Sequence, residues 1–167
     1  LGATDEAIRH SITKMAWWHF VAADEYQKRV TQMGEDPKRV FNTGGLGVDA
    51  IKKCQLLTKE DLLETFGIRF GKKNLLITFH PVTLEKDSSE KHFKALLNVL
   101  YELNDTYQIF TLPNADTDSR VIINMINDYV NNKKNSIAFA SMGQKKYLST
   151  LKFVDGVVGN SSSGLTE

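Results

Sequence analysis

Cysteine, long apolar runs and a targeting segment are scarce or missing in this chain, and each absence excludes a class of protein. The 167 residues include one cysteine, Cys54, which excludes an internal disulfide framework and a zinc site built from several cysteines. No stretch reaches the roughly 20 apolar residues of a membrane-spanning helix, and no basic-then-apolar signal peptide opens the sequence. We therefore expect a cytoplasmic protein that does not bind membranes.

An excess of charge is also missing. The 21 Lys and Arg residues nearly balance the 20 Asp and Glu residues, which gives a net charge of +1. A nucleic-acid-binding protein typically carries a basic excess or stripe, so we expect no nucleic-acid partner. The length fits one domain or parts of two larger ones. Because the chain starts with Leu1 rather than Met and stops abruptly at Glu167, shortly after a run of three serines, we expect a fragment.

The sequence alternates between strand and helix patterns. The first 43 residues predict helices around two short strands at residues 18–22 and 39–42, and Asp24 and Gln27 have the spacing of a capping box. Later apolar runs predict four strands separated by amphipathic helices, at residues 74–79, 108–112, 137–140 and 156–159. This order is typical of β-α-β units on a parallel sheet with right-handed crossovers. Trp17 and Trp18 are expected as core or interface anchors.

A domain boundary is expected between Gly44 and Lys73, where the pattern is irregular. Residues 45–50 match G-x-G-x-x-A, but the helix that follows is short and lysine-rich. A hinge is favoured there over a dinucleotide fingerprint.

Each of the four later strands runs into a polar loop. The loops are H-P-V-T at residues 80–83, P-N-A-D at 113–116, S-M-G at 141–143 and N-S-S-S-G at 160–164. Ligands of open α/β sheets bind outside the carboxyl ends of the strands, so the four loops together predict a binding site. The alternative is that these residues only form turns and caps.

The serine loop and His80 are the most informative candidates. Three hydroxyls at the start of a helix predict an anion site, and an ordinary serine N-cap is the alternative. Glu167 would lie about one turn into that helix, where its carboxylate could accept two hydroxyls, as of a ribose, or face solvent. His80 is either a structural histidine or a general acid that faces a leaving group. The four histidines show no His-x-x-x-His spacing, so no metal site is expected.

Four motifs in this order resemble one enzyme family. They are D-E-A-I-R-H-S-I-T-K at residues 5–14, F-H-P-V-T at 79–83, P-N-A-D at 113–116 and G-N-S-S-S-G at 159–164. Together they resemble the hydrolysing UDP-N-acetylglucosamine 2-epimerases of sialic-acid and related nonulosonate biosynthesis, across essentially the whole chain. The resemblance implies a GT-B-like α/β fold, with parallel sheets flanked by helices in two Rossmann-like domains. Residues 1–43 would end the first domain, 44–73 would form the hinge, and 74–167 would form most of a UDP-binding second domain.

The activity that the resemblance implies is conversion of UDP-N-acetylglucosamine and water into N-acetylmannosamine and UDP. UDP would be eliminated first, and water would then add with inversion at C2. The resemblance implies no cofactor, neither a nicotinamide nor a metal, and a homo-oligomer for the full-length enzyme. The catalytic carboxylates of the family are expected in the first domain upstream of Leu1, so this chain is expected to be an incomplete catalytic unit.

The resemblance also implies site residues. His80 would face the diphosphate or glycosidic oxygen and assist the departure of UDP, and Ser161 and Ser162 would hold the diphosphate. Glu167 would bind the ribose hydroxyls, and the backbone of Met142 would contact the uracil.

Four further residues are placed near the site by the resemblance. Asn114 matches a position near the nucleotide or a feedback effector, and Asp116 lies beside it. Arg9 and His10 lie on a helix that faces the cleft.

Several alternatives stay open. The non-hydrolysing relative would return UDP-N-acetylmannosamine, a UDP-N,N'-diacetylbacillosamine 2-epimerase would use a different sugar, and a GT-B glycosyltransferase would use the same UDP site. The chain alone would also fit a piece that binds nucleotide without turnover.

Overall fold

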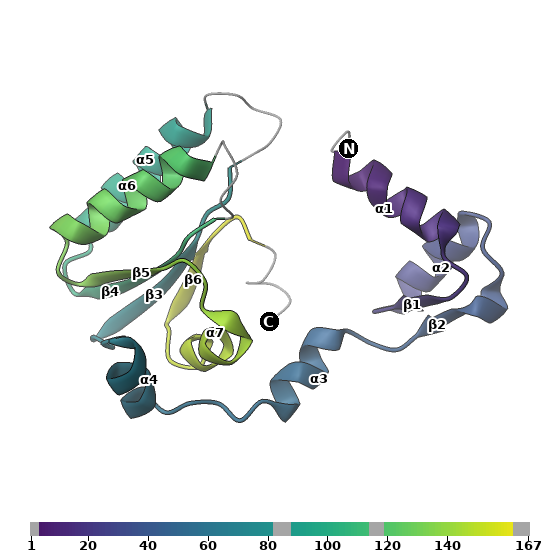
Figure 1. Cartoon of the computed structure of the whole chain (residues 1–167), viewed down its shortest axis with the longest axis horizontal. Helices are drawn as coiled ribbons and strands as arrows, with labels where there is room; N and C mark the ends of the chain where they lie inside the picture. The colour runs from purple at the N-terminus through teal and green to yellow at the C-terminus, as the bar shows by residue number, and fades with distance from the viewer. Residues whose placement is uncertain (1–3, 82–87, 114–118, 162–167) are drawn as a thin grey trace. The chain divides into compact units, whose positions relative to one another are not determined.

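The computed structural model describes residues 4–81, 88–113 and 119–161. The chain divides into two compact units, Leu1–Lys53 and Cys54–Glu167. Each unit has its own parallel β-sheet, of two strands in the first and four in the second (Figure 1). No helix in these described ranges is long and apolar enough to cross a membrane.

The first unit is a small layer of helices on two strands. Its elements are α1 (Thr4–Met15), β1 (His19–Val21), α2 (Asp24–Gln32), η1 (Pro37–Arg39), β2 (Val40–Asn42) and α3 (Leu46–Lys53). The two strands pair in parallel, with Phe20 opposite Phe41. Helix α2 packs on both strands, and Val40 is buried.

The start of α2 differs from the prediction. Ala23 is the N-cap and makes no side-chain cap hydrogen bond, so Asp24 and Gln27 form no capping box. Both side chains instead reach the neighbouring strand, because the Asn42 amide donates to Asp24 Oδ1 (2.6 Å) and Gln27 Nε2 donates to the Val40 carbonyl (2.8 Å). These two bonds fasten α2 to β2, and this tertiary pairing replaces the local cap.

A buried carboxylate fastens α1 to the same unit. Lys14 Nζ lies 2.5 Å from Glu35 Oε1, and His19 Nε2 lies 3.2 Å from Glu35 Oε2. The hydrogen bond from Lys14 holds the pKa of the Glu35 carboxyl below its ordinary value. Lys14 also donates to the Met33 carbonyl (3.1 Å), so the last turn of α1 is held at two points.

Aromatic side chains cover the face of β1 and β2 that carries Phe20 and Phe41. The Phe20 and Phe41 rings stack with centroids 5.6 Å apart, and Trp18 lies 5.8 Å from Phe41. Phe20 is 69% exposed, and Trp17 and Trp18 are each more than half exposed, so neither tryptophan lies in a core among the described residues. Arg39 stacks on the Trp17 ring at 3.9 Å.

The second unit is a parallel sheet flanked by helices, as the sequence predicts. Its elements are α4 (Lys59–Phe66), β3 (Lys73–Thr78), α5 (Ser88–Glu102), β4 (Thr106–Thr111), α6 (Ser119–Asn132), β5 (Ser136–Phe139), α7 (Gly143–Leu151) and β6 (Gly156–Gly159). The strand order is β5-β4-β3-β6, and every pairing is parallel. The chain therefore moves outward from β3 through β4 to β5 and then returns to place β6 on the other side of β3.

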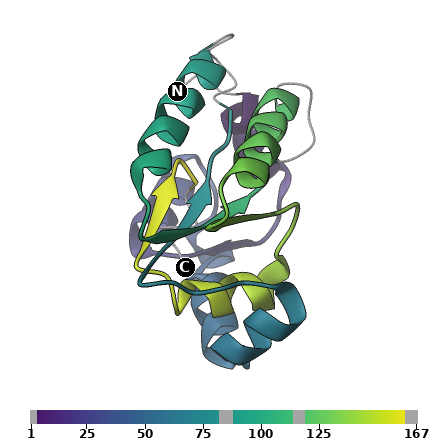
Figure 2. The ribbon, with the colours of Figure 1, turned by 90° about the vertical axis from the view of Figure 1, so that its left-hand side faces the viewer.

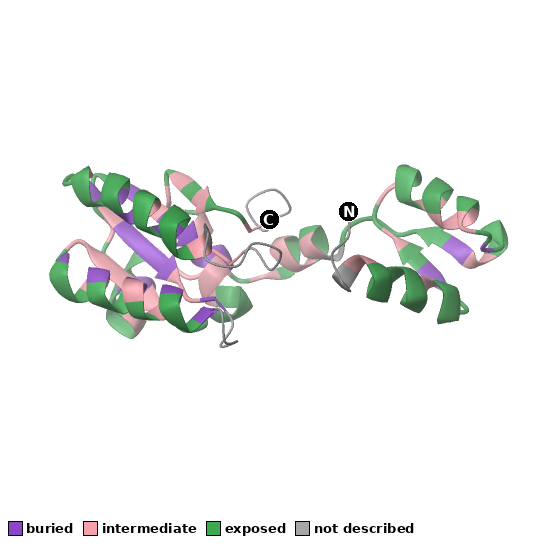
Figure 3. Ribbon diagram, turned by 90° about the horizontal axis from the view of Figure 1, so that it is seen from above, coloured by how far each residue is buried: buried purple, intermediate pink, exposed green. Residues whose placement is uncertain are grey.

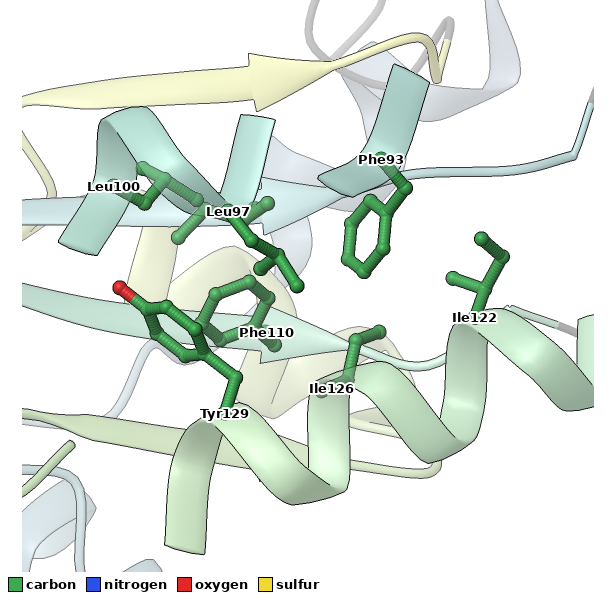
Figure 4. Packing of buried hydrophobic residues seen from close by; sticks show 8 residues of the cluster. Phe93, Leu97, Leu100, Phe110, Ile122, Ile126 and Tyr129 are labelled. Atoms are coloured by element: carbon green, nitrogen blue, oxygen red, sulfur yellow. The ribbon is translucent and has the colours of Figure 1, made fainter. Parts of the chain in front are cut away.

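Helices cover both faces of this sheet (Figures 1 and 2). Because neighbouring side chains of a strand point to opposite faces, Ile77 and Phe110 pack under α5 and α6, while Leu76 and Ile109 pack toward α4 and α7. Figure 4 shows the first of these clusters, where aromatic and aliphatic side chains of α5 and α6 meet Phe110. Figure 3 shows the same layering, with buried segments on the strands and exposed outer sides on the helices.

Two polar links hold the helices in place. Gln108 is fully buried in β4, where its Nε2 donates to the Leu100 carbonyl (2.7 Å) and its Oε1 accepts from the Tyr129 hydroxyl (2.8 Å). Burial raises the pKa of Tyr129 to about 12.

Helix α4 begins with a capping box. Thr58 accepts from the Asp61 N–H (3.1 Å), and Asp61 accepts from the Thr58 N–H (3.0 Å). The N–H of Leu57 donates to Ser149 Oγ (2.9 Å), which links the start of α4 to α7.

Candidate functional site

A pocket of about 460 Å³ opens at the carboxyl ends of β3, β4 and β5. It is lined by Thr78, Thr111, Leu112, Ala140, Ser141, Met142, Gly143, Gln144, Tyr147 and Leu148. All of these described lining residues are uncharged at neutral pH. The pocket therefore offers hydroxyls, amides and backbone groups for recognition, together with an apolar wall.

Two threonine hydroxyls join the ends of β3 and β4 in this pocket. Thr78 Oγ1 and Thr111 Oγ1 lie 2.7 Å apart, and Thr111 Oγ1 donates to the Ile77 carbonyl (3.4 Å). The register places Thr78 opposite Thr111, so the pair follows from the strand pairing itself. Either hydroxyl can donate in the bond between them, and each oxygen can also accept.

The loop between β5 and α7 forms another wall of the pocket. Gly143 has φ +62, and its N–H donates to Ser141 Oγ (3.4 Å). The Met142 side chain is buried against Leu62 and Ile109, so packing holds the backbone of this residue at the pocket lining. Among the sequence-predicted site residues that the structure describes, Met142 is the one that lines the pocket.

His80 and Ser161 follow neighbouring strands, and Asn160 connects their two loops. The His80 N–H donates to Asn160 Oδ1 (2.8 Å), and Asn160 Nδ2 donates to the His80 carbonyl (2.7 Å). The Asn160 N–H also donates to the carbonyl of Thr78 (3.3 Å), whose hydroxyl lines the pocket. The structure thus brings His80 and Ser161, both half-buried, to the same edge of the sheet as the pocket.

This meeting point lies where the order of the strands reverses. The chain leaves β3 toward β4 on one side, while β6 pairs with β3 on the other. In open α/β sheets the crevice at such a reversal is the preferred place for a ligand. The sequence predicted the converging loops but not the role of Asn160, because its partner lies 80 positions away in the chain.

The other candidates divide into two groups. Asn114, Asp116, Ser162 and Glu167 lie outside the described residues, as do residues 82 and 83 of the H-P-V-T motif. Arg9 and His10 lie on α1 of the first unit and are exposed there.

No group of three or more His, Cys, Asp and Glu side chains within the described ranges could hold a metal ion. Cys54 is a half-buried free thiol.

A four-stranded parallel sheet with helices on both faces defines a Rossmann-like α/β domain, and a hydroxyl-lined pocket lies beyond the carboxyl ends of its strands. The comparison of the sequence with known families is more specific. The UDP-N-acetylglucosamine 2-epimerase family matches residues 1–167, and the chain belongs to this family.

Curated relatives match along the whole chain. A GDP/UDP-N,N'-diacetylbacillosamine 2-epimerase (hydrolyzing) from Campylobacter jejuni is 42% identical over 168 residues, which cover 100% of this chain and 44% of that protein. The polysialic acid biosynthesis protein P7 from Escherichia coli is 38% identical, with 98% of this chain and 41% of that protein covered. A UDP-N,N'-diacetylbacillosamine 2-epimerase (hydrolyzing) from Legionella pneumophila is 32% identical, with 99% and 44% covered. The chain thus spans less than half the length of these relatives.

Solved structures share the fold at low identity. A UDP-GlcNAc 2-epimerase from Methanocaldococcus jannaschii matches with a TM-score of 0.64 and 16% identity, over 90% of this chain and 43% of that one. A UDP-GlcNAc 2-epimerase from Neisseria meningitidis, bound to UDP-GlcNAc, matches with a TM-score of 0.61 and 17% identity, over 97% and 43%. The fold is therefore the GT-B-like α/β fold that the sequence resemblance implied.

Proposed function

We propose that the chain is part of a hydrolysing 2-epimerase that converts UDP-N-acetylglucosamine and water into N-acetylmannosamine and UDP. The observation that carries this proposal is the junction of the His80 loop with the Ser161 loop at the reversal of the strand order, with an uncharged pocket at the same edge of the sheet. Membership of the 2-epimerase family supports the reaction class. Two relatives that are named as hydrolysing enzymes support the use of water.

In the proposed reaction a base removes the proton from C2 while the bond between C1 and the UDP oxygen breaks. The products of this step are a 2-acetamidoglucal with a C1–C2 double bond and UDP. Water then adds its hydroxyl to C1 and a proton to C2 from the opposite face, which inverts C2. Negative charge develops on the diphosphate as it departs, and stabilisation of this charge is expected to lower the activation barrier most. Hydrogen-bond donors that point at the diphosphate are therefore the groups that the reaction needs.

His80 and the serine loop are assigned to this departing group. His80 would act as a general acid: it would donate a proton to the glycosidic or diphosphate oxygen and so assist cleavage of the bond. Ser161 and Ser162 would hold the diphosphate through their hydroxyls. The position of Ser161 one residue after Asn160, whose amide contacts His80, supports the placement of both tasks at one point.

The remaining candidates are assigned around the nucleotide and the cleft. The buried side chain of Met142 supports a fixed backbone for contact with the uracil. Glu167 would bind the ribose, and Asn114 would lie near the nucleotide, with Asp116 beside it. Arg9 and His10 would approach from the first domain as cleft residues.

We propose residues 1–43 as the end of a first Rossmann-like domain, 44–73 as the connection and 74–167 as the UDP-binding domain. The division of the chain after Lys53 falls within that connection. The exposed aromatic face with Phe20 and Phe41 supports a larger first domain, because an apolar face of this kind normally packs against another layer. The free thiol of Cys54 fits the reducing environment of the cytoplasm. A homo-oligomer of the complete enzyme stays a prediction.

A second substrate, UDP-N,N'-diacetylbacillosamine, is favoured by a different observation. The Campylobacter jejuni relative whose name gives this substrate is 42% identical to this chain. Both sugars carry a 2-acetamido group and a UDP leaving group, so the same site and the same reaction would serve for either.

The test is product analysis with the complete protein that the gene encodes. Each of the two UDP-sugars is incubated in D₂O, and the products are identified by NMR and mass spectrometry. The proposal expects free UDP together with a 2-epimerised free sugar that carries deuterium at C2. A UDP-linked epimer without free UDP would show a non-hydrolysing enzyme, and binding of UDP without any product would show a nucleotide-binding piece.

A control separates hydrolysis from glycosyl transfer. In H₂¹⁸O the proposed reaction places the label on C1 of the free sugar and leaves UDP unlabelled. A glycosyltransferase would instead need an acceptor and would keep the configuration at C2, so an unlabelled, non-epimerised product would refute the epimerase.

A further inference from the structure

The Asn160 side chain pairs with the His80 backbone in both directions. A carboxamide carries one acceptor and one donor group in the same geometry as a peptide bond, so it can pair with a neighbouring strand as backbone does. Asn160 uses both, with Oδ1 2.8 Å from His80 N and Nδ2 2.7 Å from His80 O. The ladder between β3 and β6 ends at the pair Thr78–Gly159, and the Asn160 amide extends it toward His80.

The backbone before Asn160 directs its side chain to this place. Gly159 has φ +145, and a Cβ at this position would lie 1.7 Å from the Thr78 carbonyl oxygen. Only glycine therefore allows β6 to approach the end of β3 this closely. The Asn160 N–H then donates to the same Thr78 carbonyl (3.3 Å), which leaves the side chain within reach of His80.

We propose that Asn160 is a positioning residue, whose carboxamide sets His80 relative to the Ser161 loop for the departure of the diphosphate. This inference rests on the proposed function. One amide would place both the group that assists bond cleavage and the loop that holds the leaving group. The two hydrogen bonds lie at an exposed end of the sheet, where they add little to the stability of the fold. Their expected role is therefore to position His80.

This role predicts a particular kinetic pattern. Removal of the side chain leaves the bond from Asn160 N to Thr78 O and the whole pocket lining in place, so ground-state binding should change little. His80 would lose its position, and a displacement of about 1 Å at a reacting group costs on the order of 100-fold in rate. For Asn160→Ala in the complete protein we expect kcat for UDP release to fall about 10- to 100-fold, with KM within about threefold.

A second variant and a matched control guard against a folding artefact. Asn160→Gln keeps a neutral carboxamide but moves it by one carbon–carbon bond, so kcat should fall in the same way. Asn132→Ala removes an exposed amide that also donates to a backbone carbonyl, that of Asp128 (2.8 Å), but on the outer helix α6. This control should keep the kcat of the wild type, and all three variants should unfold within a few degrees of it.

A double-mutant cycle with His80 shows whether Asn160 acts through this residue. The reaction is followed with enzyme in excess over the sugar nucleotide, so that slow turnover remains visible. Asn160→Ala should slow the wild type but should add nothing to the loss in His80→Ala, because the two act as a unit. Wild-type kcat in both Asn160 variants, or an equal loss in the two backgrounds, would overturn the inference.

A measurement without turnover separates this inference from the proposed function. Hydrogen exchange of the His80 amide should be slowed in the wild type and at least tenfold faster in Asn160→Ala. If the wild type releases no UDP, the proposed function is wrong whatever the exchange shows. If UDP is released but the His80 amide exchanges equally fast in both proteins, the positioning role is wrong and the proposed function stands.

Discussion

Substitution of Gly159 by alanine should destabilise the second unit strongly. The new Cβ would lie 1.7 Å from the Thr78 carbonyl oxygen, whereas real Cβ atoms essentially never approach within 3.0 Å of such an atom. Strands β3 and β6 must therefore separate at this end, because the Thr78 carbonyl is backbone at the end of the interior strand β3, which also pairs with β4. The separation also pulls Asn160 away from its partners.

The size of the effect follows from the contacts that are lost. Relief of the overlap requires shifts of the backbone, which cost about 1–3 kcal/mol, and the bond from the Asn160 N–H to the Thr78 carbonyl that these shifts break is worth about 0.5–1.5 kcal/mol. Positive φ costs a non-glycine residue about 1–2 kcal/mol, and reduced freedom of the unfolded chain returns about 0.4–1 kcal/mol. We expect a loss of about 3–5 kcal/mol, or on the order of 10–20 °C in Tm for a unit of this size.

Two other glycines serve as controls that separate the steric clash with Thr78 from the strain of a positive φ. At Gly156, on the same strand, an added Cβ would lie 3.3 Å from the end of the flexible Leu75 side chain, so alanine should cost less than about 1 kcal/mol. At Gly67, which ends α4 with φ +68 in open space, alanine tests backbone strain alone and should cost about 1 kcal/mol.

Urea unfolding followed by far-UV circular dichroism measures all three variants. Both tryptophans lie in the first unit, so tryptophan fluorescence follows the unfolding of that unit, and its transition should be the same in the wild type and in all three variants. If the free energy of unfolding of Gly159→Ala lay within about 1 kcal/mol of that of Gly156→Ala, the argument from the close approach of β6 to β3 would be refuted.

Three further predictions concern single side chains. His80→Ala should lower kcat for UDP release about 10²- to 10⁴-fold, and an unchanged kcat in the product assay would remove its role in bond cleavage. Tyr129→Phe leaves the buried Gln108 Oε1 unpaired and should cost about 1–3 kcal/mol in urea unfolding. Because burial raises the pKa of Tyr129 to about 12, wild-type stability should fall as pH rises from 10 toward 12, and the Phe variant should lack this part of the loss. Glu35→Gln should flatten the acid dependence of the first unit, measured by tryptophan fluorescence. The Lys14 contact lowers the pKa of Glu35, so the stability it provides is present above 4.5 and is lost as pH falls below that value.

The regular elements of the second unit could be predicted because local pattern and tertiary packing agree. The run at residues 74–79 is apolar on both sides, and the structure buries Leu76 on one face and Ile77 on the other. The capping box of Thr58 and Asp61 depends on residues three apart, which a sequence displays directly. The capping box expected at Asp24 failed for the converse reason, since a strand 18 residues away offered its side chain a better partner.

The candidate site could be predicted only as a set of loops. The convergence of residues that follow β3, β5 and β6 depends on parallel strands, which the β-α-β order indicates. The contacts that shape the site join positions far apart, such as Thr78 with Thr111 and His80 with Asn160. No local pattern specifies them, because each depends on register and on the close approach at Gly159.

The chemistry of the pocket suggests how the proposed reaction is divided between parts of the enzyme. Hydroxyls, an amide and apolar side chains line the described pocket, which suits recognition of a neutral base and sugar by hydrogen bonds. Removal of a weakly acidic C2 proton needs a basic group, and the described lining carries none. Under the proposed function this unit would bind the nucleotide and assist its departure, while the base would reach C2 from another part of the protein. Because both steps must occur on one bound sugar, the isolated 167-residue chain should bind UDP yet release none from the UDP-sugar, and sustained turnover by the pure chain would refute this division.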